Sequence, residues 1–372
     1  MSKKLFALAA LIFYSTFSYT QTLPSDKKED FVFPGNSWEY EKDPSAQGWD
    51  TAKLKSLKQF IIDSANTTGM MVIQHGKAIF SYGDLKELSY IASCRKSVLS
   101  ILYGPFVENG KINLNSTLEQ LNIDDINGLL PSEKKATIRN LLTARSGVYH
   151  EPSYSGDEYA FAPKRGSVQP GSFFLYNNWD FNLAGYLFEK LSGVGIYDAV
   201  DSMLAHPLNM EDWDKNIQHK DADTIKSMYP AYPMWFSTRD MARIGYLMLR
   251  NGRWKDKQIT TENWVNTITT SFTSTKEMKE FKSPYYKDGA YMRYFGYGYL
   301  WWVWDAPENK GAYEGAYTAQ GNFGQYITVL PALDVVIAHK TKAAYDRYTS
   351  NYLTILTKLI AANNSELSAK NK

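Results

Sequence analysis

Four consecutive residues, Ser93, Cys94, Arg95 and Lys96, have the types and spacing of a nucleophilic centre. If Ser93 begins a helix, Lys96 lies one turn further along on the same face, so its amine can approach the serine hydroxyl. The positive end of the helix dipole and burial both favour a neutral amine, which can accept the serine proton. The spacing also fits a capping serine followed by a solvent-facing lysine. The tetrapeptide therefore predicts an activated serine, with a helix cap as the alternative.

A second segment, Tyr176-Asn177-Asn178, precedes a helical pattern that starts near Phe181. A phenol close to a lysine amine can share its proton, acting as a base toward a nucleophile and as an acid toward a leaving group. The Asn178 amide can donate to a substrate carbonyl and accept from a lysine, with Asn177 as a spacer. The alternative is that Asn178 is a turn residue that caps the following helix.

A third segment runs from Ala319 to Gln325 and leads into a strand pattern at Tyr326 to Leu330. Its glycines, Gly321 and Gly324, allow a ligand to approach the backbone closely, where a main-chain N–H can help to form an oxyanion hole. A bulge or a tight turn is the simpler interpretation of the same glycines.

Together the three segments resemble the serine β-lactamase and penicillin-recognising superfamily, and they occur in its order. The likeness spans about residues 50–362, because four further segments are also similar to stretches of that family: 141–147, 182–186, 207–210 and 237–242. The resemblance implies an α+β fold, with an antiparallel sheet built from N- and C-terminal strands and flanked by helices. A mostly helical subdomain is expected as an insertion at about residues 111–281.

The third segment departs from the pattern of that family. Many members carry Lys-Thr-Gly or His-x-Gly where this chain has Ala319-Gln320-Gly321, so the cation that would meet a substrate carboxylate is missing. Efficient β-lactam hydrolysis is therefore not expected. The form from Gly321 to Gln325 looks instead like the branch that contains 6-aminohexanoate-oligomer hydrolases and related esterases.

The resemblance to that branch implies a role for each residue. Ser93 would be the nucleophile, Lys96 its activating partner and Tyr176 the proton shuttle. The backbone N–H groups of Ser93 and Asn322 would hold the oxyanion, and Asn178 and Gly321 would contact the substrate. An ungapped alignment would place Ala319 in the position of Asn322.

We therefore expect a serine hydrolase that acts on a small ester, amide or short peptide and uses no cofactor or metal. A D,D-peptidase or β-lactamase acting in the cell wall is the second possibility. A non-catalytic peptide- or glycan-binding protein on the same fold is the third, because folds can keep their shape and lose their chemistry. No Gly-x-Ser-x-Gly motif and no metal-binding histidine spacing occur in the sequence.

The elements that must position these residues follow from periodicity. Helical patterns occupy Trp49 to Ser64, the stretch after Ser93 as far as about Gly110, residues 181–191 and 238–249, and a final segment after Tyr348. Strand patterns occupy residues 70–74 and 78–82 around a turn at 75–77, and later residues 297–304, 325–330 and 335–339, with a turn at 331–334. Strands near both ends and helices between them predict a sheet assembled from distant parts of the chain.

The N-terminus has the layout of a secretory signal. Lys3 and Lys4 precede an apolar run from Leu5 to Tyr14, which is too short to span a membrane, and a small polar stretch follows it. We expect a signal peptide at residues 1–20, an extended lead-in that is not a packed element at 21–47, and the hydrolase domain at 48–372. The protein is thus expected to be exported, periplasmic or secreted, without a stable membrane span.

Composition limits the partners. The 372 residues carry 41 Lys and Arg against 39 Asp and Glu, and loss of Lys3 and Lys4 would leave 39 against 39. A neutral chain does not favour nucleic acid as a partner. The single cysteine, Cys94, excludes an internal disulfide and is expected to pack. The five histidines are expected at the surface or in turns, and residues 149–161 as an aromatic lid or an exposed loop.

Overall fold

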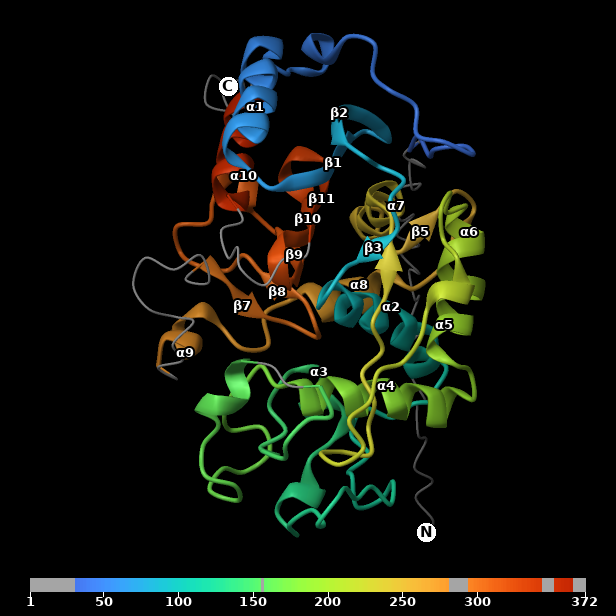
Figure 1. Cartoon of the computed structure of the whole chain (residues 1–372), viewed down its shortest axis with the longest axis vertical. Coiled ribbons are helices and arrows are strands. Elements are labelled where there is room, and N and C mark those ends of the chain that lie inside the picture. Colours follow the sequence, from blue (N-terminus) through green and yellow to red (C-terminus); the bar gives the residue numbers. More distant parts are fainter. Residues whose placement is uncertain (1–30, 155–156, 281–293, 343–350, 364–372) are drawn as a thin grey trace, which may run out of the picture. The chain divides into compact units, whose positions relative to one another are not determined.

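A seven-stranded antiparallel sheet organises the computed structural model, which describes residues 31–154, 157–280, 294–342 and 351–363. The strand order is β2-β1-β11-β10-β9-β8-β7, so strands from both ends of the sequence are neighbours (Figure 1). This confirms the predicted α+β fold. The predicted signal peptide at 1–20 and the first part of the lead-in lie outside the described residues. The strands are β1 (Thr67–Gln74), β2 (Lys77–Gly83), β7 (Gly296–Tyr297), β8 (Trp302–Val303), β9 (Tyr317–Gly321), β10 (Gln325–Leu330) and β11 (Val335–Thr341).

Two hairpins occur where the sequence predicts them. β1 and β2 are joined at His75 and Gly76, whose φ values of 49° and 79° are the left-handed conformations of a two-residue hairpin turn. β10 and β11 are joined by a short 3-10 turn at Pro331–Leu333 and by Asp334 at φ 54°. These hairpins bring the late strands β10 and β11 against the early strand β1.

The single strand predicted over residues 297–304 is wrong, because the chain forms two short strands there. β7 and β8 are joined by a tight turn in which Leu300 has φ 65° and the Gly298 N–H donates to the Trp301 carbonyl at 2.9 Å. Gly298 lies so close to neighbouring backbone that an added Cβ would be 2.4 Å from the Ile268 oxygen. The run of aromatic residues has the pattern of one strand, because leucine is not a residue type that predicts a left-handed turn conformation.

Helices cover both faces of the sheet (Figure 1). On one face, Tyr352 of α10 (Tyr352–Ala362) stacks on Tyr326 at 3.9 Å, and α1 (Thr51–Ser64) packs against α10. On the other face, α7 (Thr238–Leu249) lies so close that a Cβ on Gly245 would be 2.4 Å from Val336 and 2.9 Å from Ile327. Tyr326 and Ile327 are consecutive in β10, so their side chains point to opposite faces. α2 (Cys94–Glu108) lies beside β9 and β10.

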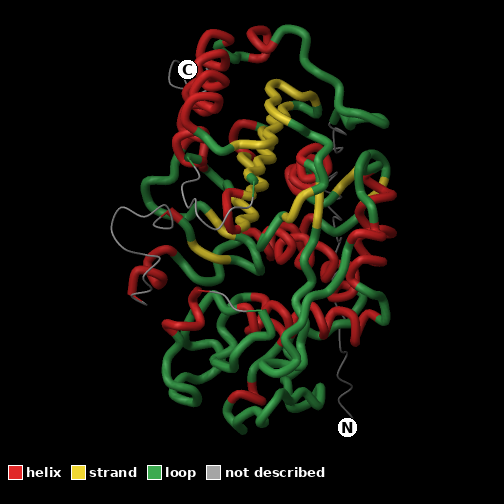
Figure 2. The backbone as a smooth tube through the Cα atoms, viewed as in Figure 1, coloured by secondary structure: helices red, strands yellow, loops and turns green. Residues whose placement is uncertain are grey.

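The helical prediction for residues 111–281 is only partly right, because loops occupy much of this region (Figure 2). Buried side chains organise those loops. The Asp125 carboxylate accepts from Trp179 Nε1 at 2.7 Å, Ser227 Oγ at 2.6 Å and the Met228 N–H at 2.8 Å, so it ties its own loop and the loop at 227–228 to the start of α4. The helices are α3 (Ile138–Leu142), α4 (Asn178–Ser192), α5 (Ile196–Ala199), α6 (His206–Leu208), α7, α8 (Glu262–Thr269) and α9 (Thr275–Glu280). Two short pairs join β3 (Ser89–Tyr90) to β4 (Trp235–Phe236) and β5 (Arg253–Trp254) to β6 (Lys257–Gln258).

The described part of the lead-in is irregular apart from a short 3-10 turn at Pro44–Gln47, and the expectation that it is not packed is wrong. Trp38 is buried, its Nε1 donates to the Arg239 carbonyl at 3.1 Å, and its ring lies 5.9 Å from that of Tyr246. The Tyr246 hydroxyl donates to the Val32 carbonyl at 2.7 Å. Proline-rich composition signals the lack of regular structure but not this contact with α7.

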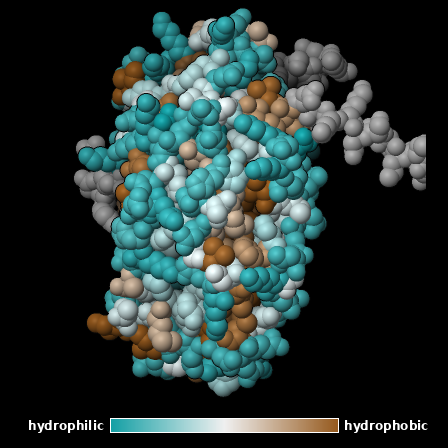
Figure 3. All heavy atoms as spheres, turned by 90° about the vertical axis from the view of Figure 1, so that its right-hand side faces the viewer, coloured by the Kyte–Doolittle hydropathy of each residue, from teal (hydrophilic) through white to brown (hydrophobic). Residues whose placement is uncertain are grey.

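Eight of the ten tryptophans are buried, so most of these rings serve packing. The face in Figure 3 is accordingly mostly hydrophilic, with hydrophobic residues in separate small groups. Within the described ranges we find no helix with the length and hydrophobicity that a membrane crossing requires.

Candidate active site

Lys96 is the centre of the candidate site. Its Nζ lies 3.0 Å from Ser93 Oγ, 2.7 Å from the Tyr176 hydroxyl and 2.8 Å from Asn178 Oδ1. The side chain is 1% exposed, whereas Ser93 is only half-buried. Ser93 makes no side-chain capping bond to α2. The alternative of a capping serine with a solvent-facing lysine is therefore wrong, and the structure brings three of the predicted side chains around one amine.

Aromatic rings fix the position of that amine. Lys96 Nζ lies 4.2 Å from the ring centroid of Tyr176 and 4.3 Å from that of Phe181. The Tyr176 ring is itself stacked on Trp302, with centroids 5.4 Å apart and an angle of 28°. Sequence reasoning missed Phe181 at the site, although it lies three residues after Asn178 on the same helical face. Trp302 is buried, and through this ring contact it also reaches the site.

The two asparagines at the start of α4 have different roles. Asn177 caps the helix, because its Oδ1 accepts from the Trp179 N–H at 2.8 Å, and its Nδ2 donates to Asp180 Oδ1 at 3.0 Å. Asn178 contacts Lys96 through Oδ1 and donates from Nδ2 to the Tyr154 carbonyl at 3.2 Å. The capping alternative for Asn178 is thus wrong, and Asn177 is more than a spacer. Residues 155–156 of the predicted lid lie outside the described residues.

The end of β9 abuts the residues that precede the serine. A Cβ on Gly321 would lie 2.3 Å from the Ile91 oxygen and 3.2 Å from the Ala92 Cβ, so only glycine fits there. Ala92 has φ 48°, a strained conformation for alanine directly before Ser93. Asn322, which is exposed, follows Gly321 at this contact, whereas Ala319 lies inside β9 opposite Ile327. This placement favours Asn322 over Ala319 as the oxyanion donor, an assignment that stays a prediction.

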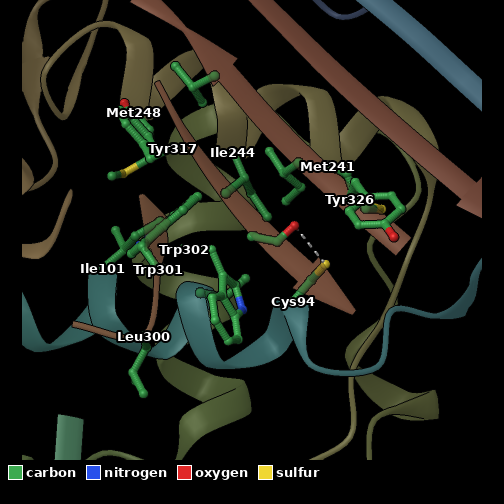
Figure 4. Packing of buried hydrophobic residues seen from close by; sticks show 14 of the residues in the cluster. Cys94, Ile101, Met241, Ile244, Met248, Leu300, Trp301, Trp302, Tyr317 and Tyr326 are labelled. Carbon is green, nitrogen blue, oxygen red and sulfur yellow. Dashed lines mark hydrogen bonds between the residues drawn. The ribbon is translucent and has the colours of Figure 1, made fainter. Parts of the chain in front are cut away.

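Cys94 is a packing residue, as predicted. It is fully buried among hydrophobic side chains (Figure 4). Its thiol lies 3.5 Å from the Ala319 carbonyl and 3.3 Å from the Gln325 carbonyl. Burial raises the pKa of the thiol. Cys94 therefore joins the first turn of α2 to β9 and β10, so the helix that carries Ser93 and Lys96 is fixed to the sheet.

The expectation for the histidines is wrong at two positions. His339 is buried in β11, where desolvation lowers the pKa of its imidazole to about 4, and His150 is buried with Nε2 2.7 Å from the Ile126 carbonyl. His339 contacts the Gly324 carbonyl and the Thr67 hydroxyl, and both nitrogens of His150 face backbone carbonyls, contacts that the sequence does not show. The described ranges contain no group of three or more His, Cys, Asp or Glu side chains that could hold a metal ion.

The antiparallel sheet and its flanking helices define a β-lactamase-like protein, in which Ser93, Lys96 and Tyr176 lie together. The chain belongs to the β-lactamase family, whose model matches residues 61–356.

Several solved structures share this fold. A protein assigned as a 6-aminohexanoate-dimer hydrolase from Bacillus anthracis superposes with a TM-score of 0.62 at 19% identity, covering 84% of this chain and 82% of that one. EstCE1, a hydrolase with promiscuous acyltransferase activity, superposes with a TM-score of 0.60 at 15% identity, and the match covers 85% of this chain and 99% of EstCE1. An octameric penicillin-binding protein homologue from Pyrococcus abyssi superposes with a TM-score of 0.60 at 20% identity, and the match covers 85% of this chain and 79% of the homologue.

Proposed function

We propose that this protein is an exported serine hydrolase that cleaves an ester or amide bond through an acyl-Ser93 intermediate. The observation that carries the proposal is the position of Lys96 Nζ, 3.0 Å from Ser93 Oγ and 2.7 Å from the Tyr176 hydroxyl. A half-buried serine next to a buried amine and a phenol has a nucleophile, a base and a proton relay within hydrogen-bond reach.

The reaction follows from these contacts. Ser93 Oγ bonds to the substrate carbonyl carbon while its proton passes to the Lys96 amine. The backbone N–H groups of Ser93 and Asn322 hold the negative oxygen of the tetrahedral intermediate. The bond to the leaving group then breaks, and the Tyr176 hydroxyl protonates that group and regains a proton from Lys96. Water attacks the acyl ester by the reverse route, releasing the acid and restoring the Ser93 hydroxyl.

The side chains of the third segment offer no cation to bind a substrate carboxylate. Ala319 presents a fully buried methyl group in place of the cation that a substrate carboxylate would need, and Gln320 beside it is neutral. The names of two similar structures, an aminohexanoate-dimer hydrolase and a hydrolase with acyltransferase activity, agree with amides or esters as substrates.

Labelling with a fluorophosphonate and hydrolysis of p-nitrophenyl esters test the proposal. Wild type should be labelled on Ser93 and should hydrolyse the ester, whereas Ser93→Ala should do neither. Ser97→Ala is a matched control, because Ser97 lies one turn further along α2 and its hydroxyl donates to the Leu300 carbonyl instead. Equal labelling of wild type and Ser93→Ala would contradict the proposal.

A D,D-peptidase or β-lactamase is the second candidate, supported by the fold shared with a penicillin-binding protein homologue. It predicts a covalent penicillin adduct on Ser93, detectable as a mass increase, and no adduct at high drug concentration would count against it. A non-catalytic binding protein would be excluded if Lys96→Ala keeps its fold and loses all turnover.

Export is proposed from the sequence of residues 1–20. N-terminal sequencing of the protein from its native cells should find a chain that begins near residue 21. An intact N-terminus on cytosolic protein would contradict this part of the proposal.

A further inference from the structure

The turn that follows β9 has a conformation that needs support. Asn322, Phe323 and Gly324 form one 3-10 turn between β9 and β10, and inside it Phe323 has φ 65° and ψ 10°. This left-handed conformation is disfavoured for a bulky side chain, so a turn of this shape persists only where its surroundings hold it. The turn begins at the residue whose N–H is the proposed oxyanion donor.

Side chains of strand β11 supply the support, because they bind the consecutive carbonyl groups of Phe323 and Gly324 in the turn. His339 Nδ1 lies 2.8 Å from the Gly324 carbonyl oxygen, and the Thr341 hydroxyl donates to the Phe323 carbonyl oxygen. Gln325 closes the contact from the other side, since its Nε2 donates to the Thr341 carbonyl at 2.9 Å. His339 and Thr341 are 1% and 5% exposed, so water does not compete for these bonds.

The orientation of the imidazole is also fixed. His339 Nε2 lies 2.8 Å from the Thr67 hydroxyl, while Nδ1 faces a carbonyl that can only accept. Nδ1 must therefore carry the proton, and Nε2 accepts from Thr67. The ring links β1, β11 and the turn as one rigid unit.

The opposite side of the turn is held as well. Gly321 packs against Ile91 and Ala92, the two residues before Ser93. A peptide segment fixed by packing before Asn322 and by two carbonyl bonds after it has little freedom to rotate. The direction of the Asn322 N–H relative to Ser93 is thus set by residues that themselves lie away from the reacting atoms.

We propose that His339 and Thr341 are positioning residues that hold the Asn322-Phe323-Gly324 turn so that the Asn322 N–H points at the oxygen of the substrate carbonyl that Ser93 attacks. This inference rests on the proposed hydrolase function. According to this inference, two side chains of β11 set the orientation of the Asn322 N–H in the oxyanion hole.

Steady-state kinetics of full-length variants on a p-nitrophenyl ester test the inference, with kcat expressed per site titrated by fluorophosphonate. Thr341→Val and His339→Leu should lower kcat about 10-fold or more, because loss of a whole oxyanion donor costs about 100- to 1000-fold. KM should stay within about twofold. Thr341→Ser and His339→Asn keep a donor near the same carbonyl and should restore most of the activity.

Thr328→Val is the matched control. Thr328 is fully buried in the neighbouring strand β10, and its hydroxyl contacts Tyr352 and Thr318 but not the turn. It should lose stability and keep its kcat per titrated site. A purely structural role of His339 and Thr341 would likewise lower the titrated fraction or the melting temperature without lowering kcat per site.

The outcomes separate the two proposals. Unchanged kcat per site in Thr341→Val, with active wild type, overturns the positioning role and leaves the hydrolase function standing. If His339→Leu does not fold, the Thr341→Val and Thr341→Ser pair decides alone. A wild type that hydrolyses no ester and takes no fluorophosphonate contradicts the hydrolase function, and the positioning role fails with it.

Discussion

Acidification should destabilise the fold through His339. Burial lowers the pKa of this imidazole from its ordinary 6.5 to about 4 in the folded chain. The unfolded chain therefore binds a proton first as the pH falls, so the free energy of unfolding decreases between pH 6.5 and 4. At about 1.4 kcal/mol per pKa unit, the full loss below pH 4 is about 3 kcal/mol, of which about 2 kcal/mol is lost between pH 7 and 4.5.

Asp240 opposes this trend. Burial raises the pKa of its carboxyl from 3.8 to about 6, so the folded chain holds that proton more tightly. Its contribution to stability grows as the pH falls from 6 to 3.8 and partly cancels that of His339. The pH dependence of wild-type stability therefore contains both contributions with opposite signs. Variants that lack one titrating group separate the two.

Urea unfolding of wild type, His339→Asn and Asp240→Asn at pH 7 and pH 4.5 makes that comparison. The stability gap between wild type and His339→Asn should shrink by about 2 kcal/mol on going to pH 4.5, because the variant lacks the titrating ring. Asp240→Asn should instead lose more stability than wild type over the same interval. A gap between wild type and His339→Asn that is constant with pH would refute the reasoning.

Four further substitutions test the site. Asn177→Ala removes a buried helix cap and should cost about 1–2 kcal/mol in urea unfolding, whereas Asn178→Ala should lower kcat with a smaller loss of stability; equal effects would contradict the division of roles. Trp302→Leu removes the ring stacked on Tyr176 and should lower kcat at least several-fold in an ester assay, and full activity would show that the stacking is dispensable. Gly321→Ala places a Cβ 2.3 Å from a backbone oxygen and should lower kcat/KM strongly, so a wild-type value would contradict the close approach of β9.

The fold and the centre of the site follow from the sequence because local signals mark them. The spacing of Ser93 and Lys96 places both on one face of α2, and the glycines of the third segment mark the close contact at Gly321. Tyr176 and Asn178 lie eighty or more residues from Lys96, yet both meet its amine. The family resemblance predicts that meeting, and periodicity alone does not.

Other features depend on tertiary contacts that leave no local pattern. The left-handed Leu300 splits a predicted strand, and the left-handed Phe323 shapes the turn after β9. His339 lies in a regular strand pattern, so neither its burial nor its contact with Gly324 can be inferred from neighbouring residues. The loops at 111–177 are held by buried carboxylates such as Asp125, which the sequence pattern does not distinguish from surface acids.

The contact between Thr67 and His339 also constrains how the protein acquires its activity. The two residues are 272 positions apart in the chain, so this bond closes a loop that contains most of the domain. Contacts of such high sequence separation form slowly. The oxyanion turn is therefore expected to be completed late in folding, and the return of ester hydrolysis after dilution from urea should lag behind the return of helical circular dichroism.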